Sequence, residues 1–344
     1  MTSAVFPGGD LARIHSAVNH FRLGLVFAIA SASAFGMSGP LAKSLLEAGW
    51  SPAAAVTARL TGGALVLALF ATAIKPGWLR EAVRHRHTVV LYGIVPVAGT
   101  QLAYYHAVSH LSVGVALLLE YTAPILVVGW LWLVHRRTPA RLTLAGTALA
   151  VGGMTLVLDV FSGAHFDVVG LAWGLTAAVC SASYFLMSDR VGTGEDGLHP
   201  VTLAAGGLLV GAVTVATAGA VGIAPLTFTT GDTVIAGVTM SWLVPVIGLG
   251  VIATAIAYTL GIIGIALLRP RFASLVGLSE VMFATVAAWL LIGETVTPVQ
   301  AVGGVIVLTG LALARQGDRP VPGTGDTPTT PVDDGPDRRV PELH

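Results

Sequence analysis

Apolar residues in this chain occur in blocks of about 20, and that length constrains the fold more than any other feature. A helix of that length crosses a hydrocarbon core of about 30 Å. A helix of a soluble protein would instead carry an apolar stripe of period 3.6. Hydrophobic residues make up 54% of the chain and charged residues only 10%, against about a quarter charged in a typical soluble domain. The sequence therefore predicts an all-α integral membrane protein.

The blocks predict ten transmembrane helices. We place them near residues 23–45, 52–74, 88–108, 112–133, 142–159, 168–188, 200–221, 239–264, 272–292 and 298–314. Residues 1–22 are expected to form a cytoplasmic N-terminal segment. Residues 315–344 are rich in Pro, Thr, Gly and Asp, and a segment with so little apolar surface is expected to be a disordered cytoplasmic tail.

One sequence pattern occurs twice, and its loop charges are reversed in the second copy. Residues 111–124 and 268–281 occupy the same place in matching arrangements of apolar segments, and Ser112 in the first copy corresponds to Arg269 in the second. The basic run at 135–139 has no basic counterpart later in the second copy. Because Lys and Arg stay on the cytoplasmic side, the reversal predicts two five-helix repeats, 23–159 and 168–314, inserted in opposite orientations. Inverted repeats are typical of secondary transporters.

The net charge of zero conceals an asymmetry between the predicted loops. The predicted external loops contain no Lys or Arg: 46–51, 109–111, 160–167, 222–238 and 293–297. The predicted internal segments hold Arg13, Arg22, Lys75, Arg80, Arg84, Arg86, Arg136, Arg137, Arg141, Arg190, Arg269, Arg271 and Arg315. Between the first and the last span, only Lys43 and Arg59 depart from this distribution, and both lie within predicted spans. The distribution predicts a multi-pass protein of a bacterial inner membrane with both termini in the cytoplasm.

The second copy resembles the repeat unit of the EamA group of the drug/metabolite transporter superfamily. The likeness rests on Tyr258, Ala273, Ser274, Leu275, Glu280, Gly293, Glu294, Thr297 and Pro298, with Val281 where the family normally has Pro. The first copy, through Glu120-Tyr121-Thr122-Ala123-Pro124, resembles the bacterial threonine/homoserine exporter branch of that family. The resemblance implies a ten-helix transporter that usually exports amino acids or related metabolites, with a central cavity lined by both repeats.

Ionisable residues inside spans are the main candidates for function, because a charge at the bilayer centre costs about 2.5–3.5 kcal/mol on insertion scales. Glu120 lies in the middle of the fourth predicted span. It has two candidate functional roles: it binds a substrate ammonium group, or it carries a proton that is exchanged for substrate. A third reading is structural, in which Glu120 only hydrogen-bonds a neighbouring helix.

Glu280 and Arg59 each have a functional reading and a structural reading, the structural one for Glu280 being a role near a helix end. Glu280 falls about one turn from the position aligned with Glu120, so the two carboxylates either approach one cavity from opposite repeats or serve separate purposes. Arg59 lies about two turns inside the second span. It either holds a substrate carboxylate by a bidentate contact or fixes a helix interface by bonding backbone carbonyls.

Amide and aromatic side chains complete the candidate substrate-binding residues. Gln101, Tyr104 and Tyr105 lie within about one turn of the third span, Tyr258 aligns with Gln101 in the second repeat, and Trp173 and Tyr184 lie on the sixth span. Tyr and Trp offer an apolar wall with one hydrogen-bonding end, which suits a zwitterion with an apolar side chain. Each residue alone is equally consistent with packing between helices.

No catalytic, cofactor or metal motif accompanies these residues. The sequence has no cluster with metal-ligand spacing, no G-x-S-x-G and no Walker-type loop. Neither an enzyme nor a nucleic-acid partner is expected; the expected partners are a small-molecule substrate, the lipid bilayer and, through Glu120, protons. The function is therefore predicted to be export of amino acids or related metabolites by alternating access. The alternatives are broad drug efflux, favoured by an almost wholly apolar cavity, and a membrane-embedded enzyme.

Overall fold

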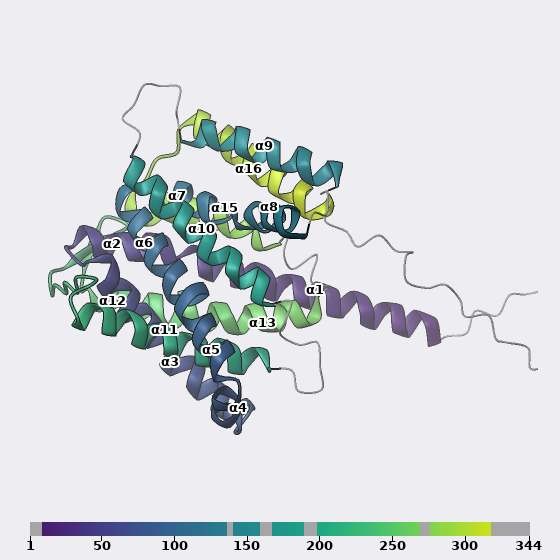
Figure 1. Ribbon diagram of the computed structural model, residues 1–344, viewed down its shortest axis with the longest axis horizontal. Coiled ribbons are helices and arrows are strands. Elements are labelled where there is room, and N and C mark those ends of the chain that lie inside the picture. The colour runs from purple at the N-terminus through teal and green to yellow at the C-terminus, as the bar shows by residue number, and fades with distance from the viewer. Residues whose placement is uncertain (1–8, 136–139, 159–166, 189–197, 269–275, 318–344) are drawn as a thin grey trace, which may run out of the picture.

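The computed structural model describes residues 9–135, 140–158, 167–188, 198–268 and 276–317. In this part of the chain the fold is almost entirely helical (Figure 1). The elements of the first repeat are α1 (Gly9–Gly36), α2 (Ser38–Glu47), α3 (Pro52–Ile74), α4 (Trp78–Arg84), α5 (Arg86–Tyr92), the π-helix η1 (Gly93–Gly99), α6 (Thr100–His110), α7 (Val113–Glu120), α8 (Ala123–His135) and α9 (Arg141–Val157).

The second repeat contains α10 (Val168–Ser188), α11 (Pro200–Ala220), β1 (Thr233–Ile235), β2 (Val238–Met240), α12 (Leu243–Ile247), the π-helix η2 (Gly248–Ile256), α13 (Ala257–Leu267), α15 (Ser279–Ile292) and α16 (Pro298–Gly317). Five helical stretches are long and apolar enough to cross a membrane: Phe21–Glu47, Pro52–Ile74, Val113–Val134, Pro200–Ala220 and Leu243–Gly264. Four shorter apolar helices accompany them. The helical membrane class is confirmed, while the count of ten spans stays a prediction.

Several predicted spans are interrupted rather than continuous. The first is divided at Met37 between α1 and α2, and the fourth is divided at Tyr121-Thr122, just before Pro124 in the first turn of α8. Proline is tolerated in the first turn of a helix, where its missing N–H is not needed. In the second repeat Leu278 is a turn before α15, so this break forms although Val281 replaces the proline usual in the family.

The helices pack in groups that mix the two repeats. Helix α1 of the first repeat packs on α13 and α15 of the second, and we call these three helices bundle B. Helix α10 of the second repeat packs on α6, α7 and α8 of the first, which form bundle A with it. Helices α3 and α11 pair with each other at the lower edge, and α9 and α16 pair at the upper edge (Figure 1).

The α9–α16 pair depends on glycines that let the two backbones touch. A Cβ atom on Gly146 would lie 2.5 Å from the carbonyl oxygen of Gly310, and one on Gly310 would lie 2.6 Å from that of Gly146. Gly153 and Gly303 oppose each other in the same way, at 2.9 Å in both directions. Because Gly146 faces Gly310 while Gly153 faces Gly303, the two helices run antiparallel. Small residues with this spacing are the usual basis of close helix packing in membranes.

A short β-hairpin departs from the all-α prediction, which had residues 222–238 as a loop. Strands β1 and β2 pair antiparallel, with Ile235 opposite Val238. The two connecting residues, Ala236 and Gly237, both have positive φ, at 54° and 74°, as a type I′ turn requires. The Ala236 N–H donates to the Leu291 carbonyl at 2.6 Å, which places the hairpin at the end of α15. We call this end of the molecule the hairpin end.

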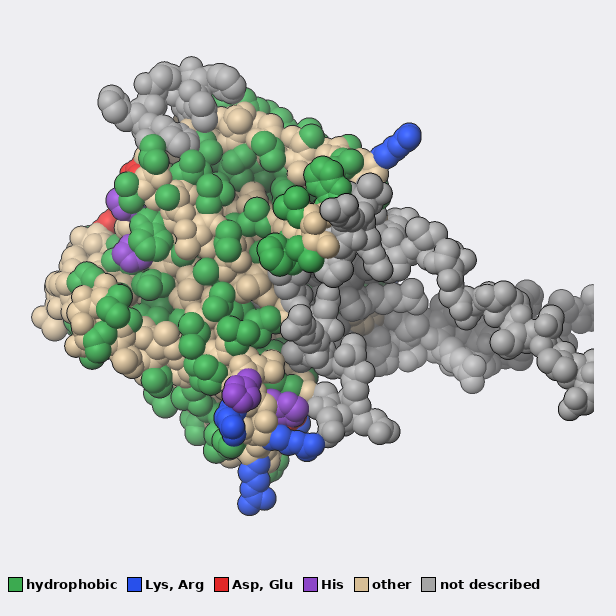
Figure 2. Space-filling model, in the orientation of Figure 1, with side chains coloured by type: hydrophobic (Ala, Val, Ile, Leu, Met, Phe, Trp, Pro, Cys, Tyr) green, Lys and Arg blue, Asp and Glu red, His purple; other side chains and the backbone are tan. Residues whose placement is uncertain are grey.

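The described ends of the chain lie opposite the hairpin end (Figure 1). Helix α1 begins at Gly9, inside the segment 1–22 that was expected to precede the first span, and α16 continues to Gly317. The remainder of the expected disordered tail lies outside the described residues. Lys and Arg side chains on the visible face gather over α4 at the lower edge and at the upper right (Figure 2). The exposed basic residues Arg80, Arg84, Arg86 and Arg141 belong to these regions.

Candidate functional site

Arg59 is the centre of a hydrogen-bonded group that draws on both repeats. Its side chain is 3% exposed. Nη1 donates to Ser38 Oγ at 2.5 Å, to Gln101 Oε1 and, at 3.3 Å, to Tyr105 Oη. Nε donates to Thr254 Oγ1 at 3.0 Å, and Nη2 donates to the Ala253 carbonyl at 3.3 Å. A buried charge is tolerated when it is compensated in this way, so the guanidinium fixes α3 against α2, α6 and η2.

The two π-helices bring partners to this arginine. Thr254 lies inside η2, and its hydroxyl donates to the Leu249 carbonyl at 2.8 Å. In the first repeat η1 contains Pro96 and ends just before Gln101. Proline removes a backbone donor and forces the helix to widen or kink, and π-helical turns occur frequently at functional sites. Tyr258 follows η2 as Gln101 follows η1, in agreement with their alignment in the sequence.

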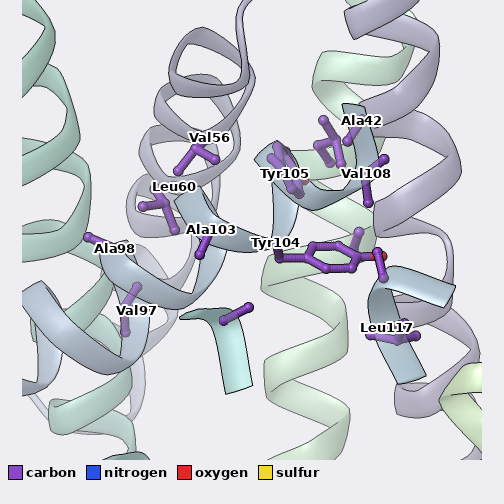
Figure 3. Close-up of a cluster of buried hydrophobic side chains, with 14 of the residues drawn as sticks. Ala42, Val56, Leu60, Val97, Ala98, Ala103, Tyr104, Tyr105, Val108 and Leu117 are labelled. Carbon is purple, nitrogen blue, oxygen red and sulfur yellow. The ribbon is translucent and has the colours of Figure 1, made fainter. Parts of the chain in front are cut away.

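Tyr104 and Tyr105 pack tightly beside the arginine. Both are nearly or fully buried, and Figure 3 shows them among apolar side chains from α2, α3, η1, α6 and α7. The Arg59 guanidinium lies 5.8 Å from the centre of the Tyr105 ring, within the range of a cation–π contact. The Tyr104 side chain points toward α7, and its hydroxyl lies against Gly39 of α2. A Cβ atom added to Gly39 would lie only 2.6 Å from this hydroxyl.

Glu120 and Glu280 lie at interrupted helix ends in opposite bundles. Glu120 is the last residue of α7, and Glu280 is in the first turn of α15, where the helix dipole favours a negative charge. Both side chains are partly exposed. Tyr121, directly after Glu120, places its hydroxyl 2.8 Å from Glu280 Oε2 and 3.0 Å from the Gly277 carbonyl. This tyrosine therefore connects bundle A to bundle B.

The two carboxylates and the guanidinium interact electrostatically without direct contact. Glu120 interacts electrostatically with Glu280 and Arg59. Arg59 interacts electrostatically with Tyr104 and Tyr258. Within the described ranges, no ion pair within 4.0 Å joins Arg59 to either carboxylate. Opposite charges thus lie near each other without a direct ion pair, an arrangement suited to a ligand that carries both charges.

The structure brings together most of the residues singled out from the sequence, in what we call the central cluster. Its members are Arg59, Gln101, Tyr104, Tyr105, Glu120, Tyr258 and Glu280. Tyr258 contacts Phe35 edge to face, with ring centres 5.1 Å apart. Trp173 instead stacks on His106 at 4.4 Å. Tyr184 lies on α10, and its side chain falls outside the described part of the structure.

Sequence reasoning did not identify three uncharged residues that hydrogen-bond to the central cluster: Ser38, Thr254 and Tyr121. Ser38 and Tyr121 belong to the segments that carry the family resemblance, but a serine or tyrosine in an apolar helix gives no signal comparable to a charge. Thr254 is set apart only by its place in η2, and the sequence did not predict a π-helix.

A second contact between bundles lies at the hairpin end. Lys43 of α2 forms an ion pair with Glu294, just after α15, and donates to the Leu111 carbonyl at 3.3 Å. The other oxygen of Glu294 accepts from the Val113 N–H at 3.0 Å, at the first residue of α7. The carboxylate therefore connects the segment after α15 to bundle A.

Glu81 makes a corresponding contact between α4 and the start of α11. Its carboxylate pairs with Lys75 at 2.6 Å, and accepts from Thr202 Oγ1 at 2.6 Å and from the His199 N–H at 3.0 Å. Burial is the largest single influence on the Glu81 pKa and raises it. The hydrogen bonds from Lys75, Thr202 and His199 together outweigh burial and lower the pKa to about 2.

A separate cavity of about 340 Å³ lies between α7, α15 and α16. Its lining is mostly apolar and includes Val115, Leu118, Met282 and Leu308, with Glu294 at one side. No member of the central cluster lines it. In the described ranges, no group of three or more His, Cys, Asp or Glu residues has the geometry of a metal site.

Comparison with known proteins assigns this architecture to a family. Residues 22–159 and 168–316 each match the sequence model of the EamA-like transporter family. The chain is 33% identical to the threonine/homoserine exporter RhtA of Escherichia coli K12, over 82% of this chain and 88% of that protein. It is 31% identical to RhtA of Salmonella typhimurium LT2, over 80% and 84% respectively. The fold is also similar to that of one protein of known crystal structure, with a TM-score of 0.60 and 20% sequence identity. The match spans 89% of this chain and 99% of the other chain.

Proposed function

The chain belongs to the EamA-like transporter family, and we propose on that premise that it exports amino acids or related small metabolites. Its relatives from Escherichia coli and Salmonella typhimurium are named for threonine and homoserine, so these two amino acids are the first substrates to test. The observation that carries the proposal is the central cluster, in which Arg59 lies near Glu120 and Glu280 without forming an ion pair with either.

The polarity of the central cluster favours a metabolite over an amphipathic drug. A drug-efflux site would present mostly apolar and aromatic walls to a variable ligand. Here a guanidinium, an amide, two carboxylates and several phenols converge from five helices, α3, α6, α7, α13 and α15. An α-amino acid carries an ammonium and a carboxylate one carbon apart. We place its ammonium group at Glu120 and Glu280, since carboxylates are the strongest acceptors for it.

We further propose that the two bundles move against each other during transport. Each bundle contains helices of both repeats, and two polar contacts join the bundles where α7 packs on α15: Tyr121 with Glu280, and Glu294 with the Val113 N–H. Contacts of this kind break and re-form at lower cost than an apolar interface. In this mechanism Glu120 also carries the coupled proton, so that substrate export is driven by proton entry.

The mechanism requires ten helices in two repeats of opposite orientation. The antiparallel α9–α16 pair supports this arrangement, because these helices occupy the same place in the two repeats and oppose each other through reciprocal glycines. The loop charges support it too, and on their basis we propose that both termini are cytoplasmic. Cysteines introduced singly into the 222–238 loop should react with a membrane-impermeant maleimide from outside, and cysteines in the 75–87 loop should not. The opposite pattern would overturn the topology.

Counterflow in proteoliposomes tests the substrate. Vesicles preloaded with unlabelled threonine should accumulate labelled threonine, and homoserine should compete, while an imposed pH gradient should change the initial rate. Protein-free vesicles are the control. Accumulation of a lipophilic cation such as ethidium, with no response to any amino acid, would support drug efflux and contradict the proposal.

A further inference from the structure

We infer that the side-chain amide of Gln101 holds the carboxylate of the transported amino acid, and that Arg59 fixes the amide in the orientation required. This inference rests on the proposed function, since it concerns how an amino acid is recognised at the central cluster. It assigns to Gln101 the role that charge alone would assign to Arg59.

The first step is that every guanidinium nitrogen of Arg59 already donates to a protein oxygen, which leaves one N–H of Nη2 on an almost fully buried side chain. Nε, Nη1 and Nη2 each donate to a protein oxygen, and Nη1 donates to three of them. The side chain is only 3% exposed. A carboxylate that bound Arg59 through two nitrogens would have to displace Ser38, Thr254 or the Ala253 carbonyl and leave buried polar atoms without hydrogen-bond partners, which is unfavourable.

The second step is that the Arg59 contact determines which way the Gln101 amide faces. An arginine donates but cannot accept, so the atom nearest Nη1 must be Oε1. The NH₂ group then points away from the guanidinium. Neither of its N–H bonds has an acceptor among the described residues, and Nε2 is not one of the fully buried atoms without a partner. Gln101 is partly exposed, so its NH₂ group faces accessible space.

The third step compares Gln101 with the neighbouring donors. The Tyr105 hydroxyl is fully buried and engaged with Ser38 and Arg59. The Tyr104 side chain is 4% exposed, and its hydroxyl lies against Gly39 and close to α7. Among the three cluster residues of α6, Gln101 is therefore the donor that is both oriented and accessible. Arg59 behind it aligns the amide dipole, so that the positive end faces the ligand.

The resulting arrangement suits a zwitterion at its two ends. The NH₂ group of Gln101, with the buried positive charge behind it, offers two donors to a carboxylate. Glu120 and Glu280 offer acceptors to an ammonium group. Glu120 and Arg59 interact electrostatically, and no ion pair within 4.0 Å joins them in the described part of the chain.

The test is a change of ligand preference in Gln101→Glu. Glutamate has nearly the same shape and keeps an oxygen toward Arg59, but it replaces the NH₂ group with a second oxygen that repels a carboxylate. Binding of threonine and of threonine methyl ester, which lacks the carboxylate charge, is measured by isothermal titration of purified protein. We expect the variant to bind threonine at least tenfold more weakly than the wild type and the ester at least as tightly.

Two further variants keep the result interpretable. Gln300→Glu makes the same chemical change at the start of α16, outside the central cluster, so it should leave the threonine-to-ester preference unchanged. Gln101→Leu has no acidic group and serves if the glutamate variant does not fold; it should also weaken threonine selectively. Equal losses of affinity for threonine and for its methyl ester in the Gln101 variants would overturn the role of Gln101. The proposed function would still stand if the wild-type protein bound threonine. A wild-type protein that bound no amino acid would overturn both.

Discussion

Lys43 and Glu294 form an ion pair that joins α2 of the first repeat to the segment between α15 and α16 of the second. The pair is only partly exposed, at 21% and 16% of the two side chains. Because Glu294 also accepts from the Val113 N–H, one carboxylate connects α2, α7 and the end of α15. In the proposed topology this is the external end of the molecule, so the pair holds the external side closed.

Glu294→Gln should weaken that closure. Glutamine keeps the size of the side chain but removes its negative charge. That charge pairs with Lys43 and also strengthens the hydrogen bond from the Val113 N–H. In a Cys180→Ser background, Ser112→Cys supplies a thiol beside Glu294 for labelling by an impermeant maleimide. We expect the Gln variant to label several-fold faster than the parent. Glu47→Gln, at an exposed position on α2, the helix that carries Lys43, should not change the rate. Equal rates in all three proteins would contradict closure by this pair.

Gly146→Ala should destabilise the protein, whereas Gly152→Ala on the same helix should not. The added methyl group on Gly146 would lie 2.4 Å from the Ala314 backbone nitrogen, but one on Gly152 meets nothing within 4 Å. Overpacking of this kind costs about 1–3 kcal/mol. Thermal unfolding of the purified variants checks the difference. Identical melting temperatures would show that α9 and α16 do not pack as closely as described.

Glu81→Gln should lower stability by about 1–3 kcal/mol near neutral pH, the range for hydrogen bonds to a charged group. The pKa of Glu81 is lowered from 4.5 to about 2 in the folded protein. A lowered pKa stabilises the fold at pH values above the unfolded pKa, and this stabilisation is lost as pH falls through the folded pKa. The difference between wild type and variant should therefore be constant above about pH 4.5 and shrink toward pH 2. A difference that grew on acidification would refute the assignment.

The sequence predicted the membrane class, the repeats and most of the central cluster, because these depend on long apolar blocks and on charges inside them. It did not predict how the residues of the central cluster are partnered. The spacing that placed Arg59 two turns inside a span left open whether it binds substrate, and only tertiary contacts show its donors occupied by Ser38, Gln101 and Thr254. Lys43 and Glu294 were both noted in the sequence, but a separation of 251 residues hid their pairing.

Local structure was also harder to read than class. The break before α15 forms without the family's proline, because turn and helix preferences depend on packing as well as on residue type. The hairpin depends on positive φ at Ala236 and Gly237; the alanine gives no signal for that conformation. Both features lie where short-range patterns are weak and contacts with other segments decide the backbone.

The central claim is that Glu120 serves transport rather than folding. Glu120 ends α7 inside the membrane, is partly exposed, and accepts no hydrogen bond from the described residues. The aligned position in the second repeat is Gly277, so the architecture itself does not require a carboxyl group there. Glutamine preserves size and most hydrogen bonding but removes the charge.

The most direct measurement is threonine counterflow by Glu120→Gln in proteoliposomes, with and without a pH gradient, at matched amounts of inserted protein and a matched melting temperature. The account predicts that the variant inserts and unfolds like the wild type but loses at least nine-tenths of the flux, a tenfold effect equivalent to about 1.4 kcal/mol. Wild-type flux with unchanged pH dependence in Glu120→Gln would contradict the account and remove Glu120 from the mechanism.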